Sequence, residues 1–343
     1  MFAFLKQKPV LANSVGVCFG KLPGTADFIR SNTSHEVVQD CDAWIQRALE
    51  QMSGVEEWGV LYDQMPLVDF CFSGRQQAKL MGVIAPSQDS VGRRYPLLAA
   101  RIESDQSESG VMSAAVLSLV PVACEALHTS LRRKLSQAGN DFDNRVVVQE
   151  CRDLCAQIEP DYLLAAEVVR QFLRTTTLGS LFAQVAKEHP DVDQETFFLN
   201  LTFSVDFARR YNDAVFNQML RLPLSADAGS QAPYASFWLA AISALLGEQN
   251  KDCNFIIARS QGRGDLLVSV REMPDKGLMA LAGRGVGRGA EVDLVAEHDV
   301  WRSHRAYADM SYAISRMCAD PALPLESLLE FFGELGKTLI KDS

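Results

Sequence analysis

The sequence contains no long hydrophobic run. No apolar stretch approaches the ~20 residues that a membrane-spanning helix needs, so membrane insertion is not expected. The first residues, from Met1 to Lys8, also lack the basic and then apolar pattern of a secretory signal peptide. Together these absences predict a cytoplasmic protein.

Positively charged residues are fewer than negatively charged ones. The chain has 33 Lys and Arg residues against 43 Asp and Glu residues, which gives a formal net charge of −10. A general nucleic-acid binder needs a basic face that neutralises phosphates, so no nucleic-acid partner is expected. An acidic surface limits non-specific association and steers toward basic partners.

The sequence has no convincing metal-binding pattern. It contains eight cysteines and five histidines. Cys151 and Cys155 could share one helix face, but two thiols without a nearby His or a Cys-x-x-Cys pair make a poor zinc site. A disulfide framework would imply a secreted chain, which the missing signal peptide contradicts. We expect no metal and no cofactor.

No complete catalytic set stands out. Ser87 and Asp89 have no neighbouring histidine, and the Gly-x-Ser-x-Gly elbow of a hydrolase is missing. The glycine-rich stretch Gly283–Gly289 lacks the Gly-Lys-Ser/Thr ending of a phosphate-binding loop. We therefore predict a protein that is not an enzyme, with a nucleotide-binding or hydrolytic accessory enzyme as the alternative.

What is present is an ordinary globular composition, with 48% hydrophobic and 22% charged residues. A length of 343 residues is enough for two domains. We place an N-terminal α/β domain at residues 1–137 and a C-terminal α/β domain at residues 145–343.

Hydrophobic periodicity predicts the elements of each half. In the first half we expect strands at 15–20, 58–62, 67–73, 79–85 and 95–102, and helices at 34–50 and 111–135. Thr33 and Glu36 form a capping box for the first helix, and Pro121 should kink the second. In the second half we expect strands at 199–207, 215–224, 253–258, 265–270 and 277–282, and helices at 145–158, 161–175, 235–246, 302–317 and 323–340.

Short sequence matches suggest an internal duplication. Lys21–Asp27 is echoed by Arg221–Asp227. Further matches in the same order pair Leu67–Ser73 with Leu266–Val270, Lys79–Ile84 with Lys276–Leu281, and Val91–Arg94 with Val286–Gly289. The alternative is two unrelated α/β halves with common turn chemistry. Closely connected strands favour hairpins. The predicted fold is therefore α+β, with two α/β lobes that each hold a mainly antiparallel sheet flanked by helices, in a longin-like or SNARE-like order.

One polar loop, Ser87–Pro96, lies between two strand-like runs. Gly92 permits a turn with positive φ, and Asp89 can accept hydrogen bonds from backbone N–H groups two residues on. Arg93 and Arg94 place two cations at the end of the turn. Two interpretations stay open: a structural connection whose arginines pair with nearby carboxylates, and a loop that faces a partner.

Several segments resemble the TagF (ImpM) family of type VI secretion-associated proteins. The resemblance rests on Phe19–Phe28, the helix that carries Trp44, Gly82–Pro96 and, more loosely, Ser236–Leu239. It implies a cytoplasmic, post-translational negative regulator that binds and sequesters a forkhead-associated (FHA) scaffold protein. A structural accessory subunit of the secretion apparatus is a further alternative.

The resemblance supplies motif positions but no catalytic residues. These positions are Gly20, Lys21, Pro23, Asp27, Ser87, Asp89, Gly92, Arg93, Arg94 and Pro96. Among them, the candidates for partner binding are Arg93, Arg94, Asp89, Lys21 and Asp27.

Overall fold

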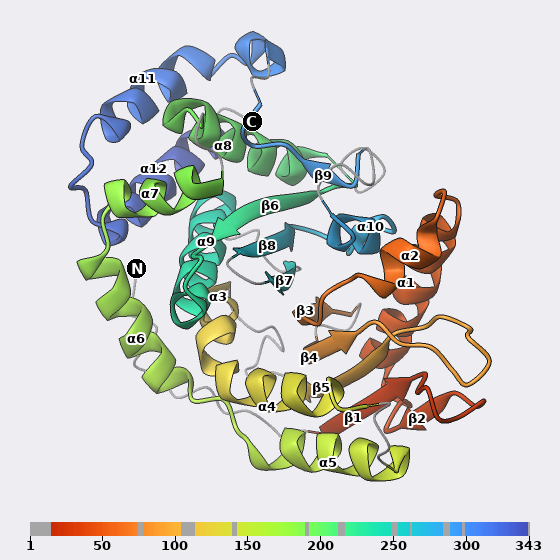
Figure 1. The fold of residues 1–343 in the computed structure, drawn as a ribbon. Helices are drawn as coiled ribbons and strands as arrows, with labels where there is room; N and C mark the ends of the chain where they lie inside the picture. The colour runs from red at the N-terminus through yellow and green to blue at the C-terminus, as the bar shows by residue number, and fades with distance from the viewer. Residues whose placement is uncertain are drawn as a thin grey trace.

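The fold is a single nine-stranded sheet with helices on both faces (Figure 1). The computed structural model describes residues 15–74, 78–103, 114–138, 143–188, 192–211, 217–247, 253–260, 263–283, 289–296 and 299–341. The strand order is β2-β1-β5-β4-β3-β7-β8-β6-β9, and every pair is antiparallel except β6 with β9. The predicted α+β class with a mainly antiparallel sheet is confirmed.

The first half of the chain follows the predicted order closely. Its elements are β1 (Val15–Gly20), β2 (Ile29–Ser31), α1 (Glu36–Ser53), α2 (Trp58–Asp63), β3 (Val68–Ser73), β4 (Lys79–Ala85), β5 (Leu97–Glu103), α3 (Ala114–Ala123) and α4 (Glu125–Leu135). The predicted kink near Pro121 is a break at Cys124, where α3 gives way to α4.

The second half is richer in helix. Its helices are α5 (Asn144–Gln157), α6 (Tyr162–Thr175), α7 (Leu178–Glu188), α8 (Gln194–Arg210), α9 (Gln231–Leu246), α10 (Gly277–Leu281), α11 (Tyr307–Cys318) and α12 (Leu325–Lys341). Its strands are β6 (Met219–Leu224), β7 (Asn254–Ser260), β8 (Arg263–Ser269) and β9 (Glu291–Val292). Short 3-10 helices lie at Ala228–Ser230 and Asp299–Ser303.

Alternating side chains divide the strands between two cores. Along β3, Phe70 and Phe72 pack with α1, whereas Cys71 points into the core on the opposite face. The same division continues in β8, where Leu267 faces the α1 side and Leu266 the other side. Helices α1, α2 and α10 therefore cover one face, and the remaining helices cover the other (Figure 1).

The strands of the two halves meet in one antiparallel pair. Val68–Cys71 of β3 pair with Phe255–Ala258 of β7, so the two predicted sheets are joined edge to edge. We call this pair the β3–β7 seam. The domain boundary between residues 137 and 145 stays a prediction, and residues 139–142 lie outside the described part.

Three predicted strands are wrong because they are helical. Residues 58–62 form most of α2, residues 199–207 lie within α8, and residues 277–282 largely coincide with α10. The alternation in α8 misled because its polar residues are buried as well. For example, Asn200 donates from Nδ2 to the carbonyls of Leu294 (3.0 Å) and Ala296 (2.8 Å). In residues 199–207, alternation of polar and apolar side chains therefore does not indicate a strand with one face exposed to solvent.

Two other local predictions fail. Helix α1 begins after His35, whose Nδ1 accepts a hydrogen bond from the backbone of Val37 at 3.2 Å, so Thr33 is not its cap. In the proposed repeat, Lys79–Ile84 is part of a strand whereas Lys276–Leu281 spans a helix, so this match is not structural. Much of the proposed counterpart of Val91–Arg94 lies outside the described residues.

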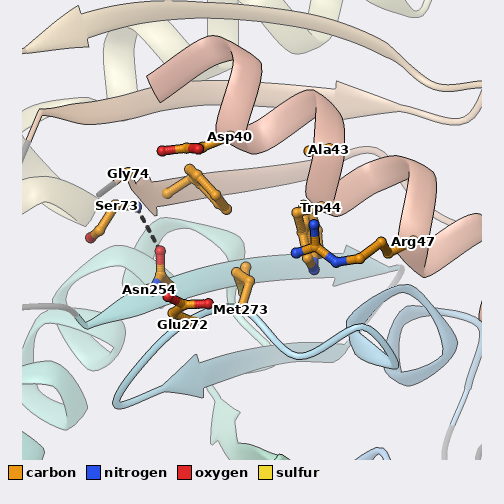
Figure 2. Close-up of a pocket in the computed structure, with 10 residues that line it drawn as sticks. Asp40, Ala43, Trp44, Arg47, Ser73, Gly74, Asn254, Glu272 and Met273 are labelled. Carbon is orange, nitrogen blue, oxygen red and sulfur yellow. Dashed lines mark hydrogen bonds between the residues drawn. The ribbon is translucent and has the colours of Figure 1, made fainter. Parts of the chain in front are cut away.

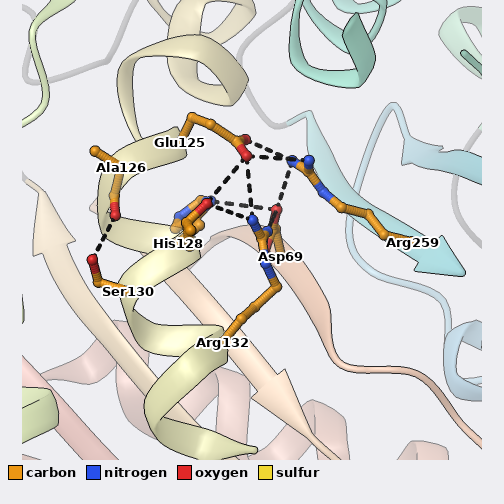
Figure 3. A network of polar contacts seen from close by, with 8 residues as sticks. Asp69, Glu125, Ala126, His128, Ser130, Arg132 and Arg259 are labelled. Carbon is orange, nitrogen blue, oxygen red and sulfur yellow. Dashed lines mark hydrogen bonds and ion pairs between the residues drawn. The ribbon is translucent and has the colours of Figure 1, made fainter. Parts of the chain in front are cut away.

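A network of buried charges crosses the β3–β7 seam (Figure 3). The carboxylate of Asp69 on β3 is shielded from solvent, and Arg132 of α4 donates to both of its oxygens. Arg259 of β7 lies 3.0 Å from Asp69 and 2.7 Å from Glu125, which also pairs with Arg132 at 3.2 Å. Two acids and two arginines thus balance their charges between strands from both halves.

His128 lies beside this network without joining it. Its Nδ1 is 3.8 Å from Asp69, and neither ring nitrogen has a hydrogen-bond partner within the described chain. Burial lowers the pKa of His128, and this effect outweighs the opposing attraction of the Asp69 carboxylate. The imidazole is therefore neutral near pH 7.

We expect Asp69→Asn to destabilise the protein by about 3 kcal/mol, because Arg132 and Arg259 would lose the buried charge between them. Asp275→Asn is the matched control, since the Arg47–Asp275 pair is half-exposed and should contribute less than about 1 kcal/mol. Urea unfolding followed by circular dichroism measures both. Equal losses for the two variants would contradict a structural role for the seam network.

Stability should fall as the pH drops below about 6.5, the pKa of an unfolded histidine. In that range the unfolded chain binds a proton at His128 that the folded chain resists, whereas above it neither state gains a proton. His128→Leu should flatten the dependence between pH 7 and pH 5 in denaturant titrations. An unchanged slope in this variant would rule out His128 as the source.

Candidate partner-binding surface

The Ser87–Pro96 loop is a tight hairpin. The N–H of Gly92 donates to the carbonyl of Asp89 at 3.0 Å, and the N–H of Asp89 donates to the carbonyl of Arg93 at 3.1 Å. Gly92 has a φ of +84°, as the sequence predicted, which suits a three-residue tip of this kind. Val91 at the tip is 68% exposed.

The carboxylate of Asp89 holds this tip together from inside. It accepts hydrogen bonds from the backbone N–H groups of Val91 (3.1 Å) and Arg93 (2.9 Å) and from Nε of Arg93 (2.6 Å). Lys21 Nζ lies 3.2 Å away. Burial alone would raise the pKa of Asp89, but these hydrogen bonds from Arg93, Lys21 and Val91 hold it well below its usual range.

The second family motif packs directly against the first. Ser87 Oγ donates to the carbonyl of Lys21 at 2.7 Å, and the N–H of Ser90 donates to the carbonyl of Thr25 at 2.9 Å. Arg93 Nη2 donates to the carbonyl of Ala26 at 2.9 Å. Residues 21–27 and 87–96 therefore form one continuous feature, which we call the motif surface.

Gly20 makes this close packing possible. Its φ is +130°, and a Cβ at this position would lie 2.1 Å from the carbonyl oxygen of Pro96. The first motif thus reaches the end of the second only because no side chain intervenes.

Arg94 faces inward on the motif surface. It forms a two-point ion pair with Asp63, with Nε–Oδ1 at 2.8 Å and Nη2–Oδ2 at 2.7 Å. Its guanidinium lies 5.5 Å from the ring centroid of Trp58, over the ring face. The pair lowers the pKa of Asp63 and raises that of Arg94. Arg94 thus ties α2 to the loop, which fits the structural interpretation of this residue.

Tyr62 is a second tie that the sequence did not reveal. Its hydroxyl accepts from the N–H of Ser87 and donates to the carbonyl of the same residue, each at 3.1 Å. We expected Trp58 and Tyr62 in a strand, so the roles of these residues and of Asp63 were missed. A six-residue helix carries too short a period to be recognised in the sequence.

Two shallow hollows flank the motif surface. One, of about 260 Å³, is lined by Pro23, Asp63, Ala85, Pro86, Ser87, Gln88, Leu97, Leu135 and Ala138. The other, of about 270 Å³, is lined by Thr25, Asp27, Ile29, Arg145, Val148 and Gln149. Asp27 is exposed there, and its carboxylate has no hydrogen-bond or ion-pair partner within the described residues.

A third pocket lies elsewhere, between α1 and the second half (Figure 2). Its volume is about 260 Å³, and its floor includes Trp44, whose Nε1 donates to the carbonyl of Pro274 at 3.0 Å. Asn254 Oδ1 accepts from the N–H of Ser73 at 2.6 Å. Because its polar groups tie the two halves together, we interpret this pocket as a by-product of the β3–β7 seam.

The serine hydroxyl and the shielded carboxylate of the motif surface are both engaged within the chain. Ser87 Oγ is hydrogen-bonded to a backbone carbonyl, and Asp89 is saturated by donors. Within the described ranges, no group of three or more His, Cys, Asp or Glu residues could hold a metal ion. The helices described here also include none with the length and apolar character to cross a membrane.

Glycine substitutions test the hairpin geometry. At Gly92 a Cβ would meet no atom within 4 Å, so Gly92→Ala should cost about 1 kcal/mol through its positive φ alone. Gly333 in α12 is equally free of neighbours but helical, so Gly333→Ala should stabilise by ~0.5–1 kcal/mol. Urea unfolding measures both. A shift of the same sign for the two variants would contradict the tip geometry.

Comparisons with known proteins agree with the resemblance. Residues 17–146 match the model of the TagF N-terminal domain, described as type VI secretion system-associated. No curated protein matches the chain. A crystal structure of PA0076 from Pseudomonas aeruginosa PAO1 aligns with a TM-score of 0.35 and 21% identity over 43% of this chain. The alignment covers 63% of PA0076, less than two thirds of its length. Residues 17–146 of this chain are therefore similar to the TagF N-terminal domain, which is associated with the type VI secretion system.

Proposed function

We propose that this protein is a non-enzymatic, post-translational negative regulator of the type VI secretion system. In this proposal it acts in the cytoplasm by binding and sequestering an FHA-domain scaffold protein. The proposal rests on one observation: the motif surface lies within the residues that match the TagF family model. Both family motifs, residues 21–27 and 87–96, fold together inside the matched region.

The chemistry of the motif surface supports binding. Its buried polar groups are satisfied within the chain, so they fix shape. Its exposed groups include Val91, which is 68% exposed, and Arg93, whose side chain is 62% exposed. An arginine held in place beside an apolar side chain is typical of residues that dominate protein interfaces. The rigid hairpin also lowers the entropy that would be lost on binding.

The direct test is capture of the FHA-domain scaffold protein of the same secretion system by the purified full-length chain. Wild type should capture it, and Arg93→Gln should weaken binding by about tenfold or more, as expected for an interface arginine. The melting temperature should stay within about 2 °C of wild type, because the Arg93 side chain is mostly exposed.

Arg316→Gln is the matched control. Arg316 is an exposed arginine on α11, outside the residues that match the TagF model, and its guanidinium lies over the ring of Tyr312. This variant should capture the scaffold as wild type does. Absence of capture by wild type, together with unchanged secretion when the chain is overproduced in cells, would reject the proposal.

A further inference from the structure

Arg93 is fixed in place yet mostly exposed. Its Nε is bound by Asp89 and its Nη2 by the carbonyl of Ala26, so the guanidinium is held at two points. Nevertheless, 62% of the side chain is accessible to solvent. Its Nη1 makes no hydrogen bond or ion pair with any described residue. The outer edge of this guanidinium therefore keeps unused N–H groups directed away from Asp89.

The Asp89 carboxylate can be neutralised without the exposed side chain of Arg93. Two backbone N–H groups and Lys21 already contact the carboxylate, and Lys21 is only 16% exposed, as expected of a structural counter-ion. Arg93 differs because most of its side chain remains in water. A guanidinium fixed in this way loses little freedom when it binds an oxyanion, and its planar fork matches two oxygens at once.

The local charge favours a singly charged oxyanion. Among the three side chains joined at Asp89, Lys21 and Arg93 contribute two positive charges and Asp89 one negative charge, which leaves this cluster a single positive charge in a chain of net charge −10. A phosphate monoester carries about −1.5 to −2 charges, and it would favour a second available cation. Arg94 does not supply that cation, because Asp63 already binds it at two points.

We propose that Arg93 receives the carboxylate of an Asp or Glu side chain on the protein that binds the motif surface. The partner carboxylate bonds to the outer N–H groups of the guanidinium, while Val91 contacts the apolar carbons beside it. This inference rests on the proposed function, because the expected partner is the FHA-domain scaffold protein. Asp89 acts indirectly, because it holds the Arg93 guanidinium in the orientation in which the partner carboxylate binds.

Calorimetry with the scaffold protein tests the geometry. Arg93→Gln should weaken binding about tenfold or more, and Arg93→Lys should recover only part of the loss, because an ammonium is a point charge without the fork. Arg316→Lys is the matched control, because this exposed arginine lies outside the motif surface, and it should bind within about twofold of wild type. Full binding by Arg93→Lys, or equal losses at positions 93 and 316, would overturn the inference.

A charge swap identifies the partner group. A photo-reactive amino acid at position 91 should crosslink to the scaffold within cells, and mass spectrometry locates the adduct and its neighbouring acids. Arg93→Glu should abolish binding, and changing the contacted acid of the scaffold to Arg should restore it at least tenfold. Failure of every neighbouring acid to restore binding, while wild type still binds the scaffold, overturns the inference and leaves the proposed function intact.

Another outcome would support the carboxylate contact at Arg93 and reject the FHA-domain scaffold protein as the partner. If wild type does not bind the scaffold but position 91 crosslinks to another protein, the same swap is made with that protein. Restoration by the swap supports carboxylate recognition and rejects the scaffold as partner. No adduct from position 91 with any protein, together with no binding of the scaffold by wild type, overturns both proposals.

Discussion

The carboxylate of Asp89 is shielded from solvent, so its charge has to be satisfied from within the chain. This requirement brings together Lys21 from one motif and the backbone N–H groups of Val91 and Arg93 from the other. The rest of the motif surface follows from it, including the hairpin at Gly92. Residues that a regulator could use for recognition are thus positioned by a residue that no partner can touch.

A second buried carboxylate has the same physical role on a larger scale. Asp69 joins α4 to strands of both halves through Arg132 and Arg259, and it does so at the only place in the described sheet where the halves pair. In each case a shielded acid and the donors around it select one arrangement, because any other would leave a charge unpaired in the interior. The two acids differ in the exposure of their arginines. The arginines that bind Asp69 are mostly buried, whereas the side chain of Arg93 is mostly exposed.

Local chemistry made part of this surface predictable. The turn at Asp89–Gly92 follows from a side chain that bonds nearby N–H groups and a glycine that accepts positive φ. Arg93 and Arg94 could not be distinguished, because their roles depend on Asp63 and Trp58, about 30 residues away on a helix that the sequence suggested was a strand. Likewise, the prediction of a strand at residues 199–207 was wrong, because the polar side chains of α8 are buried as well as its apolar ones. Long-range partners and complete burial leave no short-range signal in the sequence.

Hydrogen exchange of the chain with and without the proposed FHA-domain scaffold protein tests most directly that the motif surface is the contact. The account predicts slower exchange on binding in residues 21–27 and 87–94, with no change in α1 or in the loop after β8 that line the pocket at the seam. Protection confined to that pocket or to the helices of the second half, with the two motifs unaffected, would contradict it.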